Sequence, residues 1–434
     1  MRAAAWSAAL CCFATATLFP SAPFPSTVST HTALAQTRCT TTAASSPAIL
    51  ARPTVAERAL RFRDAWALAD GAGVTIAIID TGVADHPRLG GVLDGGDVTG
   101  GAGAFHDCDA HGTFVAGLAA GRPGNDTVAG VAPGATLLSI RHTTGEEGTL
   151  GSLATAIDAA VERGARVINV SLTSCAPPGV VPPGAPEVTA AVLRAEESGA
   201  VIVAAAGNTG GDCPEGAVAW PAILDEVIAV TAAESVAVEA APADAAPAEA
   251  VPAGYAVAAD WVDVAAPGGP VVGPAPDGET MADLQITGSR TAPIVGTSFA
   301  APLVSGTAAL LLSRHPELSP VQVRGIITAT SSPVSSAPGI GVGMVDPVAA
   351  VTWAGGPDGG TDAAAAPPPP AEPVDPAPGL RVRALALVVA AVVTAAILWS
   401  AGTAHTAANA AARVSSGPSR RDDSTRHGTG TAEG

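Results

Sequence analysis

Short apolar runs alternate with amphipathic segments from Gly73 to about Ala350, and this alternation constrains the fold more than any other feature. The clearest run covers residues 74–79 and ends at Asp80. Buried strands that alternate with helices predict a three-layer α/β fold with a mainly parallel central sheet. In such sheets, functional sites gather at the carboxyl ends of the strands. We expect further strands at 136–140, 166–170, 200–205 and 227–230, and helices at 112–121, 150–163 and 187–198.

The composition supports a globular domain and argues against one class of partner. The 434 residues leave room for a large core, and 48% of them are hydrophobic. Because only 3% are aromatic, that core must consist mainly of Ala, Val, Leu and Ile. The formal net charge of −18 argues against nucleic acid as a partner.

Residues 1–35 have the pattern of a secretory signal peptide. Arg2 precedes an uncharged apolar stretch, and Ala33 and Ala35 provide small residues at the spacing that signal peptidase prefers. The alternative is an uncleaved N-terminal anchor. The prolines that end the apolar stretch favour the signal.

If residues 1–35 are removed as a signal peptide, the number of remaining cysteines indicates how they are used. Cys39, Cys108, Cys175 and Cys213 then remain, and an even number in an exported domain predicts two disulfides. Three pairings are open at this point. A metal site is the weaker interpretation, because these four contain no CxxC pair.

The rest of the chain divides by composition. Residues 36–70 form an N-terminal extension that is helical over 54–70, and residues 71–353 form the main domain, in which 234–259 is an elongated loop. A Pro-, Ala- and Gly-rich linker covers 354–380. Residues 381–402 have the length of one transmembrane helix, with a buried core helix as the alternative, and 403–434 form a short polar tail.

Two residues at expected helix starts are candidates for catalysis. Ser298 begins a long apolar helical segment, where a serine is either a nucleophile or an ordinary N-cap. Unpaired N–H groups at a helix start stabilise the oxyanion that a nucleophilic serine creates. His111 also begins a helix, although a single histidine is usually a surface residue.

Two further candidates follow expected strands. Asp80 could orient a catalytic histidine, although an Asp before Thr-Gly often only begins a turn. Asn208, in Ala-Ala-Ala-Gly-Asn, could donate its side-chain amide to an oxyanion, or it could simply form a turn. Each candidate is weak alone, and their order Asp, His, Ser differs from that of the α/β-hydrolases.

The strings around these residues closely resemble the three signature motifs of the subtilisin-like serine proteases. They are Ile-Ile-Asp80-Thr-Gly-Val, His111-Gly-Thr-Phe-Val-Ala-Gly and Gly-Thr-Ser298-Phe-Ala-Ala-Pro. The resemblance covers about residues 54–350 and implies the subtilisin-like fold. It also implies a triad of Asp80, His111 and Ser298, with Asn208 in the oxyanion hole. No metal or cofactor enters this reaction, although subtilisins often bind structural Ca²⁺.

Within that family, the chain is most similar to the type VII secretion mycosins of actinobacteria. This resemblance implies disulfides Cys39–Cys108 and Cys175–Cys213, and an extension that wraps the fold. It also implies a protein or peptide substrate, a single membrane anchor with the protease outside and the tail inside the cell, and a type VII secretion membrane complex as partner. The alternatives are a structural subunit whose proteolysis is secondary, and a free secreted degradative subtilisin.

Overall fold

The computed structural model describes residues 39–353, apart from 144–147, 211–212, 215, 236–249, 288 and 334–336. The segments expected to be the signal peptide, linker, transmembrane helix and tail therefore lie outside the described residues. Within the described part of the chain, no helix is long and apolar enough to cross a membrane.

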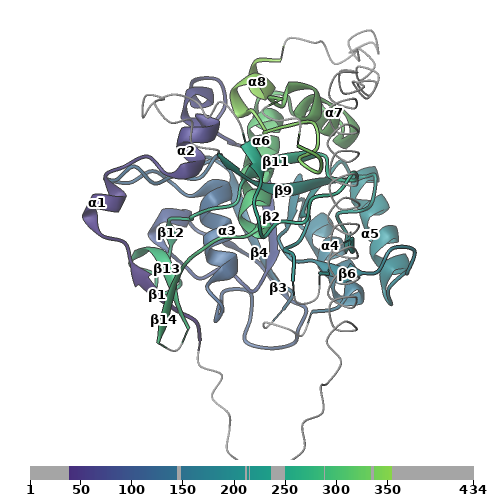
Figure 1. Ribbon diagram of the computed structural model, residues 1–434, viewed down its shortest axis with the longest axis horizontal. Coiled ribbons are helices and arrows are strands. Elements are labelled where there is room, and N and C mark those ends of the chain that lie inside the picture. Colours follow the sequence, from purple (N-terminus) through teal and green to yellow (C-terminus); the bar gives the residue numbers. More distant parts are fainter. Residues whose placement is uncertain are drawn as a thin grey trace, which may run out of the picture. The chain divides into compact units, whose positions relative to one another are not determined.

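An eight-stranded sheet forms the centre of the fold. Figure 1 shows this sheet between helices. Its order is β10-β9-β7-β5-β2-β4-β3, and β11 also pairs with β9. Only β10 runs antiparallel to its neighbour, so the predicted mainly parallel sheet is confirmed. The strands are β2 (Thr75–Asp80), β3 (Leu93–Asp97), β4 (Thr136–Arg141), β5 (Val167–Val170), β7 (Val201–Ala205), β9 (Val227–Ser235), β10 (Ala250–Pro252) and β11 (Val264–Pro267).

Side chains of the central strands point alternately into two cores, one on each face of the sheet. In β2, Ile76 and Ile78 belong to one core, whereas Ala77 and Ile79 belong to the other. A strand that is buried on both faces must be apolar at nearly every position, which explains its unbroken run in the sequence.

Helices cover both faces of the sheet. Helices α3 (His111–Ala120) and α6 (Thr297–Arg314) pack on the first core, and α4 (Leu150–Glu162) and α5 (Ala185–Glu197) pack on the second. The result is the predicted three-layer arrangement. Further helices are η2 (Pro87–Leu89), α7 (Pro320–Thr330) and α8 (Pro347–Thr352).

The N-terminal extension differs from its prediction. The single helix expected over 54–70 is two short helices, α2 (Val55–Leu60) and η1 (Phe62–Ala67), because Arg61 adopts a left-handed conformation with φ 49°. Leu60 and Phe62 on either side of this break are both buried. The break therefore lets both apolar residues contact the same core.

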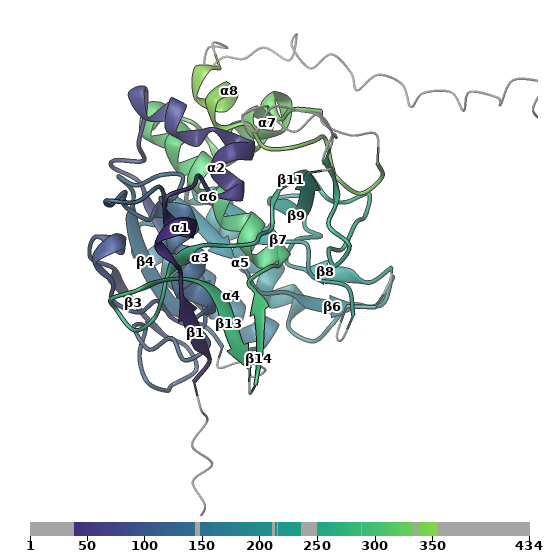
Figure 2. The ribbon, with the colours of Figure 1, turned by 60° about the vertical axis from the view of Figure 1, so that its left-hand side comes forward.

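The extension also adds a strand to a second sheet, beside which α1 (Pro47–Leu50) lies in Figure 2. Strand β1 (Thr41–Ala44) pairs antiparallel with β13 (Met281–Thr287). On its other edge, β13 pairs with β12 (Gly273–Pro274) and β14 (Arg290–Pro293). The segment before residue 54 is thus joined by backbone hydrogen bonds to the segment just before α6.

The sequence predicted that 234–259 is an elongated loop, but part of this segment is a strand. Residues 250–252 form β10, which pairs antiparallel with the end of β9. Beyond it, Ala256 forms an isolated bridge with Asn208. The physical reason is that the open edge of β9 offers hydrogen-bond partners to a returning chain, which a Pro- and Ala-rich composition does not reveal. A small sheet of β6 (Ser174–Ala176) and β8 (Val218–Trp220) lies outside both of these sheets.

Candidate active site

A carboxylate and an imidazole meet at the carboxyl end of the central strand β2. Asp80 is the last residue of β2 and is fully buried, and His111 is the first residue of α3. The His111 Nδ1 atom lies 2.6 Å from Asp80 Oδ1. The same carboxylate oxygen accepts hydrogen bonds from the Thr81 N–H (2.8 Å) and from the Thr81 hydroxyl (3.2 Å). These contacts fix the carboxylate beneath the imidazole.

The start of α3 approaches the end of β2 so closely that a side chain would not fit between them. A Cβ atom on Gly112 would lie 2.0 Å from the carbonyl oxygen of Gly82. The preceding Ala110 has φ 63°, a conformation that is unfavourable for residues other than glycine. Such strain persists only where the surrounding structure enforces it. The absence of a side chain at Gly112 therefore permits this close approach.

The imidazole of His111 is surrounded by negative charge. Burial opposes its charged form, but the carboxylates of Asp80, Asp107 and Asp109 together outweigh burial and raise the pKa of His111 above 6.5. Asp80 contributes most to this rise, through its charge and its hydrogen bond. Because Nδ1 faces Asp80, Nε2 is the nitrogen left to accept a proton. The arrangement can therefore hold a general base and stabilise its protonated form.

Ser298 is the second residue of α6, and the N-cap position is Gly296. The interpretation of Ser298 as an ordinary N-cap is therefore wrong. Its carbonyl oxygen accepts a hydrogen bond of 2.7 Å from the Ser171 hydroxyl, which follows β5. The next residue, Phe299, places its ring 5.0 Å from the His111 ring. Within the described residues, no hydrogen bond joins the Ser298 hydroxyl to His111, and such contacts are often open before substrate binds.

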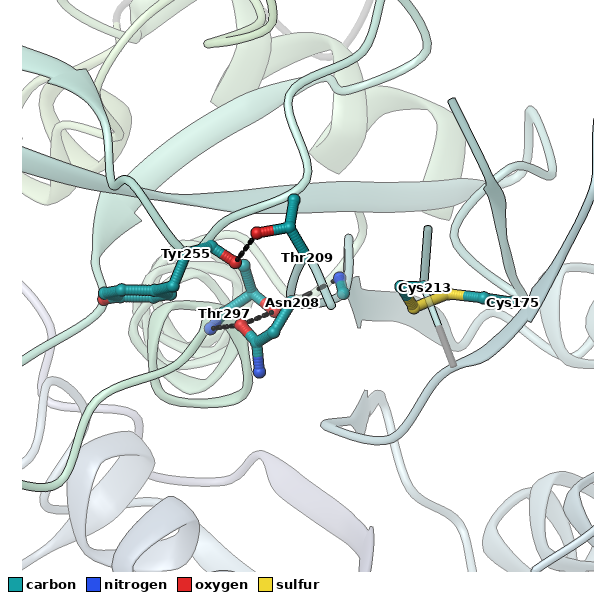
Figure 3. Close-up of a disulfide and its surroundings, with 7 residues drawn as sticks. Cys175, Asn208, Thr209, Cys213, Tyr255 and Thr297 are labelled. Atoms are coloured by element: carbon teal, nitrogen blue, oxygen red, sulfur yellow. Dashed lines mark hydrogen bonds between the residues drawn. A yellow bond between two sulfur atoms is a disulfide. The ribbon is translucent and has the colours of Figure 1, made fainter. Parts of the chain in front are cut away.

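Asn208 lies in an exposed loop after β7, and its side chain is held by the start of α6, as Figure 3 shows. Its Oδ1 atom accepts hydrogen bonds from the Thr297 N–H (3.0 Å) and hydroxyl (3.2 Å). An N–H donor requires the amide oxygen, so these contacts fix which end of the amide faces Thr297. The Nδ2 group is left as a donor, close enough to Gly296 that an added Cβ there would lie 3.4 Å from it.

The described residues contain two disulfides, and they join the pairs that the resemblance implied. Cys39–Cys108 attaches the N-terminal extension to the turn before α3. Cys175–Cys213 lies beside the Asn208 loop, and a Cβ atom on Gly207 would lie 3.2 Å from Cys213 Sγ. The second disulfide therefore supports the loop that carries the candidate oxyanion donor.

A metal centre is not assigned to the described residues. The grouping of Cys39, His106 and Cys108 brings three potential ligand atoms within 4.8 Å of one another. The two sulfur atoms are bonded to each other, however, so neither is available as a thiolate ligand.

A cavity of about 630 Å³ opens beside the strand ends that carry the site. Leu172 and Thr173, which follow β5, form part of its wall, and Leu150 and Trp220 form another part. His142 lines it as well, and burial lowers the pKa of His142 so that this ring is neutral at pH 7. A neutral, partly apolar hollow suits an uncharged side chain of a ligand.

Sequence reasoning did not single out several residues that organise the site. Thr297 orients Asn208, and Phe299 contacts His111, yet both lie inside the motif around Ser298. Thr81 and Asp107 lie inside or beside the other two motifs. These residues lie in or beside the recognised motifs, but their contacts join residues 26 to 188 positions apart and are visible only in the fold.

Comparisons with known proteins agree with this geometry. The sequence profile of the Subtilase family matches residues 71–361. Mycosin-4 of Mycobacterium tuberculosis is 38% identical over 329 residues, covering 70% of this chain and 71% of mycosin-4. The solved MycP3 protease from the type VII (ESX-3) secretion system has a TM-score of 0.64 at 36% identity, covering 73% of this chain and 92% of that one. A chain in an intact ESX-5 inner membrane complex has a TM-score of 0.65 at 30% identity, covering 84% and 94%.

Proposed function

The chain belongs to the subtilase family of serine endopeptidases, and from this premise we propose that Asp80, His111 and Ser298 are its catalytic triad. Ser298 attacks the scissile carbonyl, and His111 takes the serine proton and then delivers it to the leaving amine. Asp80 holds the His111 tautomer and stabilises the imidazolium. Water then hydrolyses the acyl-enzyme by the same route.

The contact of 2.6 Å between His111 Nδ1 and Asp80 Oδ1 is the observation that carries this proposal. In a catalytic triad the carboxylate binds Nδ1 of the histidine, as Asp80 does here. Nε2 is then left for the serine hydroxyl. Its surroundings support it, because the raised pKa of His111 favours the charged imidazole that forms in the transition state.

The oxyanion is held by two donors in this proposal. One is the Asn208 Nδ2 group, since the side-chain oxygen Oδ1 already accepts a hydrogen bond from Thr297. The other is the backbone N–H of Ser298, because the first N–H groups of a helix have no acceptor within that helix. Both act on negative charge that develops only during the reaction, which is how such donors accelerate the chemical step.

The substrate class is a protein or peptide bound in an extended conformation. The small residues Ala204 and Ala205 at the end of β7 and the Leu172-Thr173 segment after β5 are compatible with strand-like binding. The cavity lined by Leu172, Leu150 and Trp220 would receive an uncharged substrate side chain.

We also propose that the protease acts outside the cell, attached to the membrane by residues 381–402 and associated with a type VII secretion complex. The similarity to a chain of the ESX-5 inner membrane complex supports this location and partner. The same similarity supports a second function, in which the chain is mainly a structural subunit of such a complex. A free degradative subtilisin is the remaining alternative.

Labelling with a fluorophosphonate probe tests the nucleophile. Ser298→Ala should abolish labelling of the full-length protein, whereas Ser313→Ala should leave it unchanged. Ser313 is the matched control because it lies in the same helix α6, where its hydroxyl donates to the carbonyl of Ala72. Labelling that survives Ser298→Ala would disprove the assignment.

Two experiments separate the alternatives in the host cell. Secretion is compared in a Ser298→Ala strain and in a strain without the protein. If only the deletion blocks secretion, the structural role dominates, and if both block it, proteolysis is required. Fractionation tests the anchor, because activity found only in the medium would contradict membrane attachment.

A further inference from the structure

A second buried carboxylate, Asp107, lies beneath the candidate triad and has no part in the mechanism above. It is 7% exposed and lies in the turn before α3. Its Oδ2 atom accepts hydrogen bonds from the N–H (2.8 Å) and hydroxyl (2.5 Å) of Thr113. Its Oδ1 atom accepts the Thr81 hydroxyl at 2.8 Å.

Thr81 links this carboxylate to Asp80. Its hydroxyl has a single hydrogen and two carboxylate acceptors, Asp107 Oδ1 at 2.8 Å and Asp80 Oδ1 at 3.2 Å. The Gly112 N–H donates to the same hydroxyl oxygen at 3.0 Å. Because one hydrogen serves one acceptor well, Thr81 satisfies either Asp107 or Asp80 and not both at once. The shorter distance favours Asp107 when that carboxylate is charged.

The Asp107 carboxylate changes its charge at a pH close to that at which a histidine titrates. Burial raises the pKa of Asp107 to about 6, against the hydrogen bonds from Thr113 and Thr81, and the negative charge of Asp80 adds to the rise. The charge also reaches His111, because Asp107 contributes to the raised pKa of that ring. Asp107 and His111 therefore influence one another's proton binding.

We propose that Asp107 is a positioning residue of the triad: its negative charge supports protonated His111, and its protonation turns the Thr81 hydroxyl from Asp107 to Asp80. This inference rests on the triad in the proposed function. When Asp107 takes a proton from solvent on Oδ1, its new O–H donates to Thr81 Oγ1. Thr81 keeps its own hydrogen and donates it to Asp80 Oδ1. Asp80 then holds an additional hydrogen bond, and His111 becomes less basic.

Other titratable groups lie near this cluster. The guanidinium of Arg141, 5% exposed, donates to the Thr81 carbonyl at 3.3 Å and pairs with Asp97. The backbone N–H of His142 donates to the Asp80 carbonyl. Asp80 and Asp109 act on the charge of His111, and Asp80 also acts on Asp107 and His142. Arg141 pairs with Asp97, and His106 directly precedes Asp107 in the chain.

A purely structural role for Asp107 makes a different prediction. Its bonds to Thr113, the third residue of α3, are those of a helix cap. Asparagine caps helices about as well as aspartate, so Asp107→Asn keeps the cap and removes the charge. The amide also imitates the protonated carboxyl, because its NH₂ group can donate to Thr81 Oγ1. A cap alone would leave the titration of His111 unchanged.

The test is the titration of His111 in the full-length protein in detergent, followed by NMR of ¹³C-labelled histidine and assigned by loss of the signal in His111→Gln. Asp107→Asn should lower the midpoint by about half to one pH unit. It should also sharpen the curve to that of a single site, because the coupled neighbour is gone. The pH at which fluorophosphonate reactivity is half-maximal should fall by the same amount.

Three further variants keep the test decisive if Asp107→Asn does not fold. Thr81→Val removes a hydrogen bond that favours charged Asp107, so Asp107 should stay protonated to a higher pH and the His111 midpoint should fall. Thr81→Ser keeps the hydroxyl and should restore the wild-type value. Asp263→Asn is the matched control, because Asp263 is another carboxylate whose pKa burial raises. It precedes β11 and so lies at the opposite end of a parallel strand from the site.

An unchanged His111 midpoint in folded Asp107→Asn, or equal midpoints in Thr81→Val and Thr81→Ser, would overturn the proposal. The NMR titration requires no turnover. A shift in Asp107→Asn would therefore stand even if Ser298→Ala still reacted with the probe, and the two failures are distinguishable.

Discussion

The Thr297 backbone N–H donates to Asn208 Oδ1 at 3.0 Å, so the residue before the candidate nucleophile orients the candidate oxyanion donor. Thr297 also accepts a hydrogen bond from the Gly207 N–H through its hydroxyl oxygen, at 3.1 Å. Two hydrogen bonds, one donated by each segment, therefore join the loop after β7 to the start of α6. The candidate nucleophile and the candidate oxyanion donor are therefore held at fixed positions relative to each other before any substrate binds.

Removing the Asn208 amide should slow the chemical step with little effect on substrate binding. Asn208→Ala is expected to lower kcat by about 10²–10³, a magnitude measured in subtilisin, and to leave KM nearly unchanged. Steady-state kinetics with a fluorogenic peptide measure both. The control is Thr209→Ala, because among the described residues this exposed neighbour bonds only to the Tyr255 carbonyl. A loss of less than about threefold in Asn208→Ala would remove this residue from the oxyanion hole.

The pH dependence of the enzyme follows from the charge around His111. The general base must be neutral to accept the serine proton, and the pKa of His111 is raised. Activity should therefore fall as the pH drops through a midpoint above 6.5, the ordinary value for histidine. A profile of kcat/KM against pH checks this. An acid limb centred below 6.5 would contradict the stabilising effect of Asp80.

Much of the candidate site could be predicted from the sequence because each candidate residue lies in a short continuous motif. Asp80, His111 and Ser298 each lie within a run of neighbours that specifies a strand end or a helix start. The buried runs likewise predicted the central strands, because a strand covered on both faces has no polar side to present. Local pattern and tertiary position agree at these places.

Contacts between distant segments could not be predicted in this way. β1 consists of Thr-Thr-Ala-Ala, which has no alternation of polar and apolar residues, and it forms only because β13 offers an edge. The left-handed residue between α2 and η1 is Arg61, so no glycine indicates this helix break in the sequence. The Thr81–Asp107 and Thr297–Asn208 pairs depend on how helices meet strand ends, and each member alone is an ordinary polar residue.

The two disulfides should differ in their effect on activity. The Cys175–Cys213 bond packs against Gly207, the residue before Asn208, so Cys175→Ala/Cys213→Ala should lower both stability and kcat. The Cys39–Cys108 bond attaches the N-terminal extension, and Cys39→Ser/Cys108→Ser should lower stability by about 2–4 kcal/mol while most of kcat remains. Urea unfolding and kinetics measure the two effects. Equal kcat losses in the two double variants would show that support of the Asn208 loop is not specific to the nearer disulfide.

The buried pair of Arg141 and Asp97 should stabilise the fold far more than the exposed pair of Arg194 and Asp158. Side chains in the first pair are 6% and 8% exposed, against 51% and 39% in the second. Asp97→Asn leaves the Arg141 charge buried without its partner, so we expect a loss of about 1–3 kcal/mol in the free energy of unfolding. Asp158→Asn should lower it much less, because both side chains of that pair are open to solvent.

The pH dependence of this difference gives a second check. Burial opposes the charged form of Asp97, but hydrogen bonds from Thr99, Gly103 and Arg141 outweigh it and lower the pKa of Asp97 to about 2. A depressed pKa stabilises the fold above 3.8, the ordinary value for this group, and the effect is lost as the pH falls through about 2. Urea unfolding should therefore show a constant gap between wild type and Asp97→Asn from pH 7 to about 5, closing toward pH 2. A gap that persists at pH 2 would mean that the loss comes from packing and not from charge.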